Sequence, residues 1–352
     1  MKIVIADDCP GGAHSWQRKS MAKAFVYCGH EVVIWDINKK SEYDCFDIHM
    51  PDLLIFQTYN ITPALIECLK ENLATKVIMK ASDFGSISEK VSKEYPVLVK
   101  NDKELDLMLK LKEATGKPDF LFIHYHPDYL ERTHGYWASQ GFKVISDLNA
   151  ADIFEYTNGE SKKEYECDIA YVGGSWNYKN LVLHPYILPL CQDFKYKIKI
   201  FGNGWSVPQS MGFLPEGEEK NLYSSAKLNL CLHEPHSQKY GYDITEKFFK
   251  LAINKALSVT DYVWGLEKIY PKNCINSARS PKEFHQKIYD LINDWDNYHL
   301  FRKEYTENAY KHTLENHTYF DRISNIFLSL GMKDESSNVL LKKSEIIEKL
   351  KL

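Results

Sequence analysis

The amino-acid sequence predicts an α/β fold made of two Rossmann-like, doubly wound domains. Short apolar segments rich in β-branched residues alternate with helical patterns, and this alternation starts again after residue 166. Segments that are apolar on both faces are typical of strands in a parallel sheet covered by helices. Each half of the chain therefore predicts one parallel sheet, and we expect the two domains to face each other across a cleft.

The N-terminal domain is predicted to span residues 1–157. Its first strand is "KIVIA", and a loop, "DDCPGGAHS", joins this strand to the helix "WQRKSMAKAFVYCG", which ends at Gly29. The later strands of this domain are predicted at five short apolar segments: "EVVIWD", "DLLIFQ", "KVIMKA", "FLFIHY" and "KVISDL".

The C-terminal domain is predicted to span residues 158–310. It begins with a charged segment, "NGESKKEYE", which we interpret as the linker between the domains. Predicted strands follow at "CDIAYV", "YKIKIF", "LNLCLH" and "ALSVTD". Residues 311–352 predict C-terminal helices that pack back on the N-terminal domain. The tail "SSNVLLKKSEIIEKLKL" has helical amphipathic spacing, which a solvated chain end explains equally well.

Composition narrows the class of protein. The 352 residues, 44% of them hydrophobic, can bury the cores of two domains. Lys plus Arg is 44 and Asp plus Glu is 48, so the charge of −4 gives no footprint for non-specific binding of nucleic acid or anionic membranes. The chain starts without a secretory signal and lacks an apolar run of membrane-spanning length. Eight cysteines without a CxxC pair indicate reduced thiols, so we expect a cytoplasmic protein.

Glycine-containing turns after predicted strands are the first candidate binding features. They are "DDCPGGAHS", "ASDFGS", "GGSWNYKN" and "FGNGW". Glycine after a strand lets backbone N–H groups approach a phosphate, and the N-terminus of a following helix adds partial positive charge. Each turn alone is a weak signal, because most such turns only redirect the chain, and the sequence has no Walker A motif.

The segment "YDITEKFF" has an unusual charge at a helix start. Thr245 is the predicted N-cap, which places Glu246 and Lys247 in the first turn. A lysine there opposes the helix dipole unless an anion lies nearby. Lys247 therefore indicates a diphosphate site, with Glu246 available for ribose or sugar hydroxyls. An exposed Glu–Lys pair is the alternative, and the charge pattern alone favours that alternative.

Several segments carry a resemblance to known enzymes: "DIAYVGGSW", "IKIFGNGW", "LYSSAKLNLCLH", "ALSVTD" and "ENHTYFDRISNIF". In this order, they resemble the two-domain glycosyltransferases of GT-B architecture, particularly the spore-maturation glycosyltransferase-like family. The outline is also similar to the phage DNA β-glucosyltransferases. Separately, "YDITEKFF" is similar to the Tyr-x-Thr-Glu-Lys signature of α1,3-fucosyltransferases, in which the lysine contacts the donor phosphate.

The resemblance implies a set of residues that bind a nucleotide-sugar donor. The glycine turn at 173–175 would line the diphosphate, Lys179 and Lys247 would supply cations, and Gly202 with Asn203 would face the base or ribose. Lys250 departs from the pattern, because this architecture usually has a ribose-binding carboxylate there. A UDP-sugar is the expected donor, with a GDP-sugar as the alternative. The implied donor-binding residues are Gly173, Gly174, Ser175, Lys179, Gly202, Asn203, His233, Tyr242, Asp243, Glu246 and Lys247.

Catalysis by direct displacement requires a base that deprotonates the acceptor hydroxyl. Asp83 in "ASDFGS" is the favoured candidate, and Asp8 and His14 are the others. Each could instead cap a turn, and a retaining mechanism would need no such base. Gly11, Gly12, His124 and His126 are the expected acceptor-side residues of the N-terminal domain. Metal binding by "HYHPD" is disfavoured, because no third ligand lies at a fitting spacing.

The sequence thus predicts a glycosyltransferase that moves a sugar from a nucleotide-diphosphate sugar to an acceptor hydroxyl. A glycan or glycoprotein is the expected acceptor, and hydroxymethylated DNA is the alternative. No cofactor is expected to be required, and the need for a divalent metal stays open. A sugar-nucleotide epimerase and a non-catalytic nucleotide-sugar binder are the remaining hypotheses.

Overall fold

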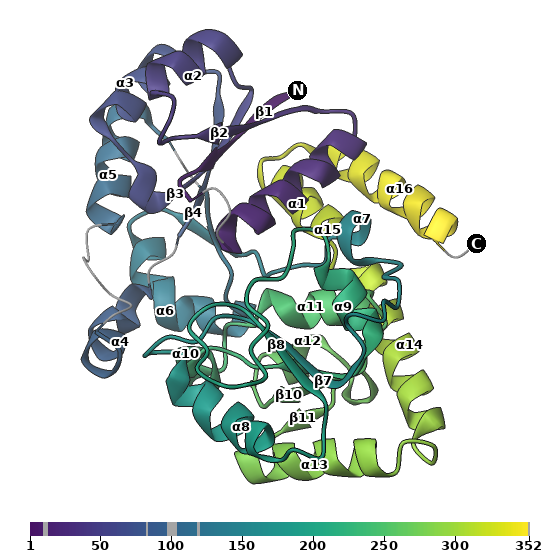
Figure 1. Cartoon of the computed structure of the whole chain (residues 1–352). Helices are drawn as coiled ribbons and strands as arrows, with labels where there is room; N and C mark the ends of the chain where they lie inside the picture. The colour runs from purple at the N-terminus through teal and green to yellow at the C-terminus, as the bar shows by residue number, and fades with distance from the viewer. Residues whose placement is uncertain (10–12, 82–83, 97–103, 118–119, 351–352) are drawn as a thin grey trace. The chain divides into compact units, whose positions relative to one another are not determined.

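The chain is divided into two compact units in a computed structural model that describes residues 1–9, 13–81, 84–96, 104–117 and 120–350. The first unit combines Met1–Leu148 with Tyr319–Leu352, and the second is Asn149–Thr318 (Figure 1). The expected linker, residues 158–166, lies inside the second unit, where Lys162 forms an ion pair of 2.7 Å with Glu218.

The first unit contains a parallel sheet, which in the described residues has the strand order β2-β1-β3-β4-β5-β6. Its inner strands are buried on both faces, as expected for a sheet with helices on both sides. The strands are β1 (Lys2–Asp7), β2 (Glu31–Asp36), β3 (Leu53–Gln57), β4 (Lys76–Lys80), β5 (Phe120–Ile123) and β6 (Lys143–Ser146).

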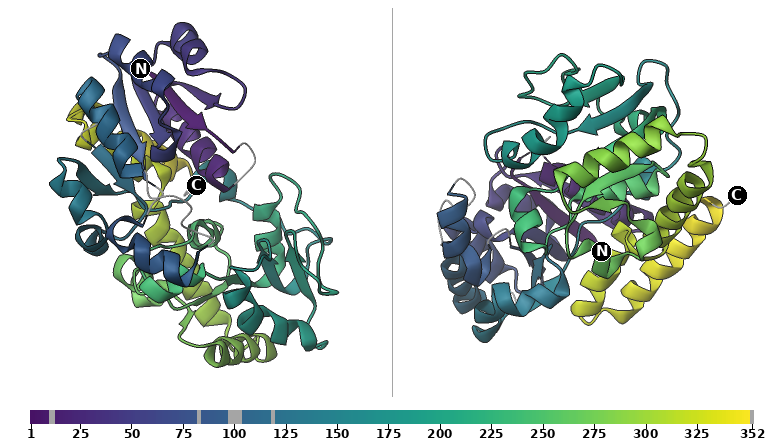
Figure 2. Two further views of the ribbon diagram at one scale, coloured as in Figure 1. Left: turned by 90° about the vertical axis from the view of Figure 1, so that its left-hand side faces the viewer. Right: turned by 90° about the horizontal axis from the view of Figure 1, so that it is seen from below.

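The helices of the first unit include two from the C-terminal end of the chain. Phe327 of α15 contacts Phe25 of α1 with ring centroids 5.6 Å apart, and Phe320 lies 5.7 Å from Tyr27. The helix α16 packs on α15 (Figure 1 and Figure 2). The helices are α1 (Ala13–Tyr27), α2 (Glu42–His49), η1 (Thr58–Asn60), α3 (Pro63–Glu71), η2 (Gly85–Ile87), α4 (Ser88–Glu94), α5 (Glu104–Thr115), α6 (Pro127–Ser139), α15 (Tyr319–Ser329) and α16 (Lys333–Leu350).

The second unit contains another parallel sheet, with the order β11-β10-β9-β7-β8 in the described residues. Apolar side chains of β7, β8 and β9 pack against α8 and α13 in its main core. The strands are β7 (Cys167–Val172), β8 (Ile198–Phe201), β9 (Ala226–Cys231), β10 (Ser258–Asp261) and β11 (Ser277–Ala278).

A serine cap and a proline mark where one helix of the second unit begins. Ser280 caps α13 by accepting a hydrogen bond of 3.2 Å from the Glu283 backbone, and Pro281 occupies the first turn. The helices are α7 (Ile153–Tyr156), α8 (Asn180–Gln192), α9 (Glu219–Ser225), α10 (Pro235–Tyr240), α11 (Glu246–Ile253), α12 (Leu266–Ile269), η3 (Lys272–Cys274), α13 (Pro281–Asn293) and α14 (His299–Asn316).

Among the strands that the structure describes, each sheet has one point at which the strand order reverses. In the first unit this point lies between β1 and β3, and in the second it lies between β7 and β9. Ligands of doubly wound folds bind beyond the carboxyl ends of the strands at such a switch point. The two parallel sheets confirm the predicted α/β fold. Their switch points are the positions where a ligand-binding site is expected.

Candidate functional site

Two glycine turns meet at the carboxyl edge of the second unit's sheet. One follows β7 at residues 173–175, and the other follows β8 at residues 202–204. The Gly173 N–H donates to the Phe201 carbonyl at 2.7 Å, and the Ser175 N–H donates to the Asn203 carbonyl at 2.8 Å. These backbone hydrogen bonds continue the β7–β8 pairing beyond the strands, so the two predicted donor turns form one surface.

Glycine is required where these turns touch. A Cβ atom on Gly202 would lie 2.3 Å from the Gly173 carbonyl oxygen, and one on Gly204 would lie 2.0 Å from that of Ser175. A Cβ on Gly174 would meet Oδ1 of Asn203 at 2.4 Å. Gly202 also has a φ of +136°, which side-chain-bearing residues rarely adopt. These glycines therefore allow the backbones of the two turns to lie in direct contact.

Lys247 is a partly buried cation beside these turns. Its Nζ lies 4.1 Å from the ring centroid of Tyr171, the residue two before Gly173. No carboxylate of the described residues forms an ion pair with it. Burial, together with the nearby charge of Lys179, lowers the pKa of Lys247 to about 8. A cation in this setting gains stability from any anion that binds next to it.

Lys179 contributes a second cation near the same turn. It precedes the first residue of α8, and its Nζ forms an ion pair of 2.9 Å with Glu234, which follows β9. Ser175 in the turn donates a hydrogen bond of 2.6 Å to Oδ1 of Asn180. The carboxyl ends of β7 and β9, neighbours at the switch point, thus carry cations, one carboxylate and backbone amides.

His233 and Asp261 form a buried pair at the ends of β9 and β10. Asp261 Oδ1 accepts from the His233 backbone at 3.0 Å and lies 2.8 Å from His233 Nδ1, while Gln238 donates to Oδ2 at 2.5 Å. Burial raises the pKa of Asp261, but its interactions with His233 and with the amide of Gln238 outweigh this effect, so the net shift is downward. The ionised carboxylate fixes a proton on Nδ1 and leaves Nε2 as a hydrogen-bond acceptor.

Several buried polar atoms at this edge lack a hydrogen-bond partner among the described residues. They include Nε2 of His233, the hydroxyl of Tyr171 and Oε2 of Glu234, whose other oxygen pairs with Lys179. Burial raises the pKa of the Tyr171 hydroxyl, so this group remains a protonated donor. Buried polar atoms in folded proteins nearly always have a hydrogen-bond partner. The unused donor and acceptor therefore fit a polar ligand or bound water at the switch point.

Lys250, the departure from the expected pattern, has a structural explanation. Its Nζ lies 3.2 Å from Glu219 and 3.9 Å from Glu246. Glu219 also accepts hydrogen bonds from Tyr156, at 2.8 Å, and from Tyr223. Desolvation alone would lower the pKa of Lys250, but Glu219 and Glu246 raise it. Lys250 thus belongs to a buried ion-pair network, and this network holds Glu246 as well.

Tyr242 and Asp243 lie in the loop before α11. The Tyr242 side chain is fully buried and stacks on Tyr240, with ring centroids 5.7 Å apart. Asp243 accepts a hydrogen bond of 3.1 Å from Ser237 and lies 3.3 Å from Nε2 of His236. Both residues hold the loop in place, and their contact with a donor remains a prediction.

The switch point of the first unit contains an ion-pair cluster. Arg18 of α1 lies 2.5 Å from Asp7 and 2.6 Å from Asp8. Burial would raise the pKa of Asp8, but a hydrogen bond from Tyr59 and the charge of Arg18 outweigh it, and the pKa is lowered. A carboxylate held this way is a weak base, so its candidacy as the catalytic base rests on position alone.

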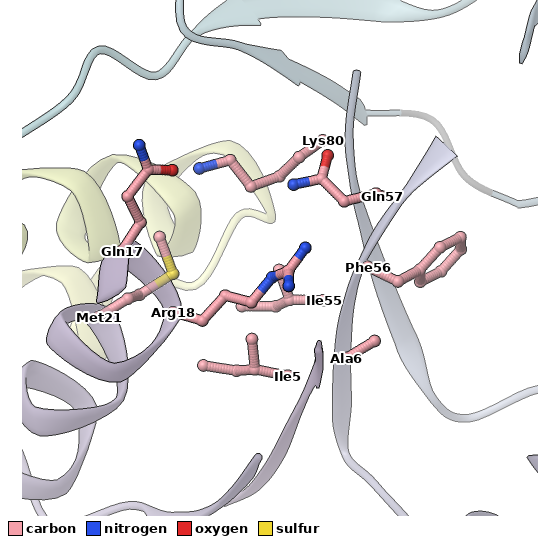
Figure 3. Close-up of a pocket in the computed structure, with 9 residues that line it drawn as sticks. All are labelled: Ile5, Ala6, Gln17, Arg18, Met21, Ile55, Phe56, Gln57 and Lys80. Atoms are coloured by element: carbon pink, nitrogen blue, oxygen red, sulfur yellow. The ribbon is translucent and has the colours of Figure 1, made fainter. Parts of the chain in front are cut away.

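A small pocket lies beside this cluster. In Figure 3, the polar ends of Gln17, Arg18, Gln57 and Lys80 gather in it above an apolar floor. The cavity of about 20 Å³ has room for a water-sized group. Lys80 also forms an ion pair of 2.9 Å with Asp147, whose Oδ1 has no hydrogen-bond partner among the described residues.

The site residues predicted from the sequence did not include Lys80, Asp147 or Asp261. Asp147 and Lys80 lie at or just after strand ends, as Asp261 does in the second unit. A polar residue at the carboxyl end of an apolar strand was the available signal. Which of these ends are neighbours is set by the strand order, and the sequence pattern does not reveal that order.

The structure describes only some of the remaining site residues that were predicted in the first unit. Asp83, Gly11 and Gly12 lie outside the described residues, and so does the side chain of His14, in the first turn of α1. His126 accepts a hydrogen bond of 3.2 Å from the Asp128 backbone as the N-cap of α6. The expected strand "FLFIHY" ends at Ile123, so His124 and His126 lie beyond it.

The fold defines the class of this protein as an α/β chain of GT-B architecture. Sucrose-phosphate synthase from Thermosynechococcus elongatus aligns with a TM-score of 0.65 and 10% identity, covering 94% of this chain and 99% of that one. An alpha-glucosyltransferase solved with UDP-glucose and DNA containing an abasic site gives 0.62 and 15%, covering 89% and 95%. T4 phage BGT in complex with its UDP-glucose substrate gives 0.56 and 14%, covering 100% of both chains.

A match to a protein-family model indicates what kind of domain part of the chain forms. Residues 186–327 match the family described as Glycosyl transferase-like, so the predicted class of enzyme, a glycosyltransferase, is confirmed at this level. No curated protein matches the chain by sequence. In the residues that the structure describes, no helix is long and apolar enough to cross a membrane, and no group of three His, Cys, Asp or Glu residues could hold a metal ion.

Proposed function

We propose that this protein transfers a sugar from a UDP-sugar to an acceptor hydroxyl and binds the UDP diphosphate at the β7–β9 switch point. The observation that carries the proposal is the set of unmatched groups there. Lys247 has no carboxylate partner among the described residues, and the buried Tyr171 hydroxyl and His233 Nε2 are unsatisfied at the same edge of the sheet as the glycine turns. A diphosphate with its attached sugar offers an anion and hydroxyl groups to match all three.

The cations and backbone amides would act on the leaving group. As the bond between the sugar and the diphosphate breaks, negative charge develops on the diphosphate oxygens. Lys247, Lys179 and the N–H group of Gly174 would stabilise that charge without reorganisation, which is the main source of rate in such a site. The N–H groups of Gly173 and Ser175 already donate to Phe201 and Asn203, so they hold the shape of the turn. Gly202 and Asn203 would face the base or ribose. The donor is taken as UDP-glucose-like because two of the similar solved structures hold UDP-glucose.

The acceptor hydroxyl would be deprotonated from the first unit. Asp83 remains the preferred base, with Asp8 and His14 as the other candidates, and a retaining mechanism would dispense with all three. The acceptor-side roles of Gly11, Gly12, His124 and His126 remain predictions of the same kind. We propose a glycan or glycoprotein as the acceptor.

DNA is the second candidate acceptor. One specific observation favours it, because one of the similar structures holds DNA together with UDP-glucose. The formal charge of −4 opposes it. A DNA-modifying enzyme would bind hydroxymethylated DNA with an affinity that falls steeply as salt concentration rises, whereas an enzyme acting on neutral glycans would show no such dependence.

The test is to measure binding of UDP and GDP by calorimetry, and then sugar transfer from UDP-glucose to glycans and to hydroxymethylated DNA. Binding of UDP that weakens in Lys247→Gln supports the proposed donor site. Transfer that is lost in Asp83→Asn identifies the base. Binding of UDP with no release of UDP from any UDP-sugar would favour a non-catalytic binder, and conversion of the sugar without an acceptor would favour an epimerase.

A further inference from the structure

A second concave site lies within the second unit, at the opposite edge of its sheet from the glycine turns. It is a surface hollow of about 440 Å³. Its lining includes Ala226, the first residue of β9, and Leu257, which precedes β10. The glycine turns follow the carboxyl ends of β7 and β8. Because all strands of this sheet are parallel, the hollow lies at the amino edge and the candidate donor site lies at the carboxyl edge.

The lining of the hollow is strongly basic. It contains Lys227, Lys255, Arg302 and Lys303, together with His299, and no carboxylate of the described residues lines it. The chain as a whole has more acidic than basic residues, 48 against 44. The hollow is therefore a local reversal of the overall charge. These side chains come from three separate elements, β9, the turn after α11 and the first turns of α14, so the fold brings them together.

Two of the four cations have carboxylate partners outside the lining. Lys227 pairs with Asp168 at 2.8 Å, and Lys255 pairs with Glu307 at 3.0 Å. Arg302 and Lys303 form no ion pair with any carboxylate of the described residues. The positive charge that remains in the hollow therefore belongs mainly to these two residues of α14.

Arg302 is held in one position by its surroundings. The guanidinium carbon lies 3.6 Å from the ring centroid of Trp295, and one terminal nitrogen donates to the Trp295 carbonyl. Burial lowers the pKa of Arg302, and the charge of Asp296 only partly offsets this shift. A fixed guanidinium loses little conformational entropy when it binds an oxyanion, and its geometry suits phosphate.

We propose that this hollow binds a small phosphate-bearing molecule of about sugar-phosphate size. Its volume lies within the range of small-ligand sites, roughly 300–1,000 Å³. Arg302 and Lys303 supply the unmatched charge for one phosphate group. Because the hollow and the glycine turns lie at opposite edges of the sheet, both sites can be occupied at once, and the phosphate compound acts as a separate ligand of the enzyme.

The test uses the full chain with saturating UDP present, so that the candidate donor site is filled. Binding of glucose 6-phosphate and inorganic phosphate is measured by calorimetry, with chloride at matched ionic strength as the reference. We expect saturable binding that weakens by about tenfold or more in Lys303→Glu and in Arg302→Gln. Lys311→Gln, a change of an exposed lysine on the same helix, should bind like the unmodified chain.

The variant Lys303→Glu is expected to fold normally, because this side chain is exposed and has no packing role comparable to that of Arg302. A loss of binding in this variant therefore reports on the hollow and not on misfolding. Absence of phosphate and glucose 6-phosphate binding would overturn the proposal, as would binding that survives both substitutions. Binding lost in Lys247→Gln instead would assign the anion to the donor edge and also overturn it. UDP affinity measured on the same samples shows separately whether the proposed function holds.

Discussion

At the residue scale, Lys247 is the side chain on which the proposed donor site depends most. It lies in the first turn of α11 without a carboxylate partner among the described residues, and its amine has a pKa of about 8 instead of the usual 10.5. In the absence of ligand, the unfolded chain holds this proton more tightly than the folded one between these two pH values. The contribution of Lys247 to folding stability therefore rises as pH increases from about 8 to 10.5.

Binding of UDP should have the opposite dependence on pH. A diphosphate beside Lys247 favours its charged form, so binding takes up a proton and weakens as pH rises from 7 to 9. Lys247→Gln should weaken UDP binding by on the order of tenfold or more and remove this pH dependence. Calorimetry in buffers of different ionisation enthalpy measures both effects, with the exposed Lys272→Gln as the control. Equal pH profiles for the unmodified chain and Lys247→Gln would contradict the assignment.

Asp261 should act as a positioning residue through His233. Its carboxylate accepts from the backbone and the ring of His233 and from Gln238, and this arrangement sets the tautomer that leaves Nε2 as an acceptor. Asp261→Asn presents an amide to one of these donors and disturbs the ring. We expect the rate of sugar transfer to fall by on the order of tenfold or more while UDP affinity stays nearly unchanged.

Steady-state kinetics and UDP binding of Asp261→Asn, compared with His233→Gln, separate this role from a general loss of structure. If the folded variants have reduced UDP affinity in proportion to the rate, the pair supports the fold and has no specific role toward the sugar. Full transfer rates in both variants would remove His233 from the proposed site.

At the element scale, the two glycine turns act as one unit. Gly202→Ala would force a Cβ to 2.3 Å from the Gly173 carbonyl at a backbone angle that favours glycine, so we expect a loss of about 2–4 kcal/mol of folding free energy. Gly212 has a φ of +74° and open space around it, so Gly212→Ala should lose only about 1 kcal/mol. Urea unfolding of both variants makes the comparison, and equal losses would mean that the turns do not constrain each other.

The sequence pattern located most strands and both glycine turns of the second unit, because apolar runs and glycine positions are local signals. It also placed the start of α11 at Thr245, which is the observed N-cap, although its side chain makes no capping hydrogen bond. The pairing of Gly173 with Phe201 and the contact of Lys247 with Tyr171 join segments that are distant in sequence. No local pattern encodes such contacts.

At the scale of the whole molecule, the chain returns to its first unit after completing the second. The helix α15 packs on α1 and α16 packs on α15, and Lys343 of α16 pairs with Asp321 of α15 at 2.5 Å. Both side chains of this pair are largely removed from solvent. The C-terminal helices are therefore part of the core of the first unit.

Removal of residues 333–352 should destabilise the first unit. The truncation deletes Val339 and Ile346, whose burial contributes roughly 3–6 kcal/mol to folding, and Asp321 would lose its partner. Chemical denaturation of the shortened chain measures the loss, and Leu341→Ala, at a side chain that is 65% exposed, should change stability by less than about 0.5 kcal/mol. An unchanged transition after truncation would show that α16 is dispensable for this unit.

Short-range patterns of apolar strands and amphipathic helices predicted the parallel α/β architecture. The charge at the start of a helix, together with the resemblance to known enzymes, indicated Lys247. Which strand ends are neighbours follows from the packed fold and from no local pattern. The packed fold placed β7 beside β9, joined His233 to Asp261, gave Lys250 a partner in Glu219 and gathered the basic hollow from three elements. These outcomes depend on strand order and side-chain packing, which arise from contacts across the whole chain.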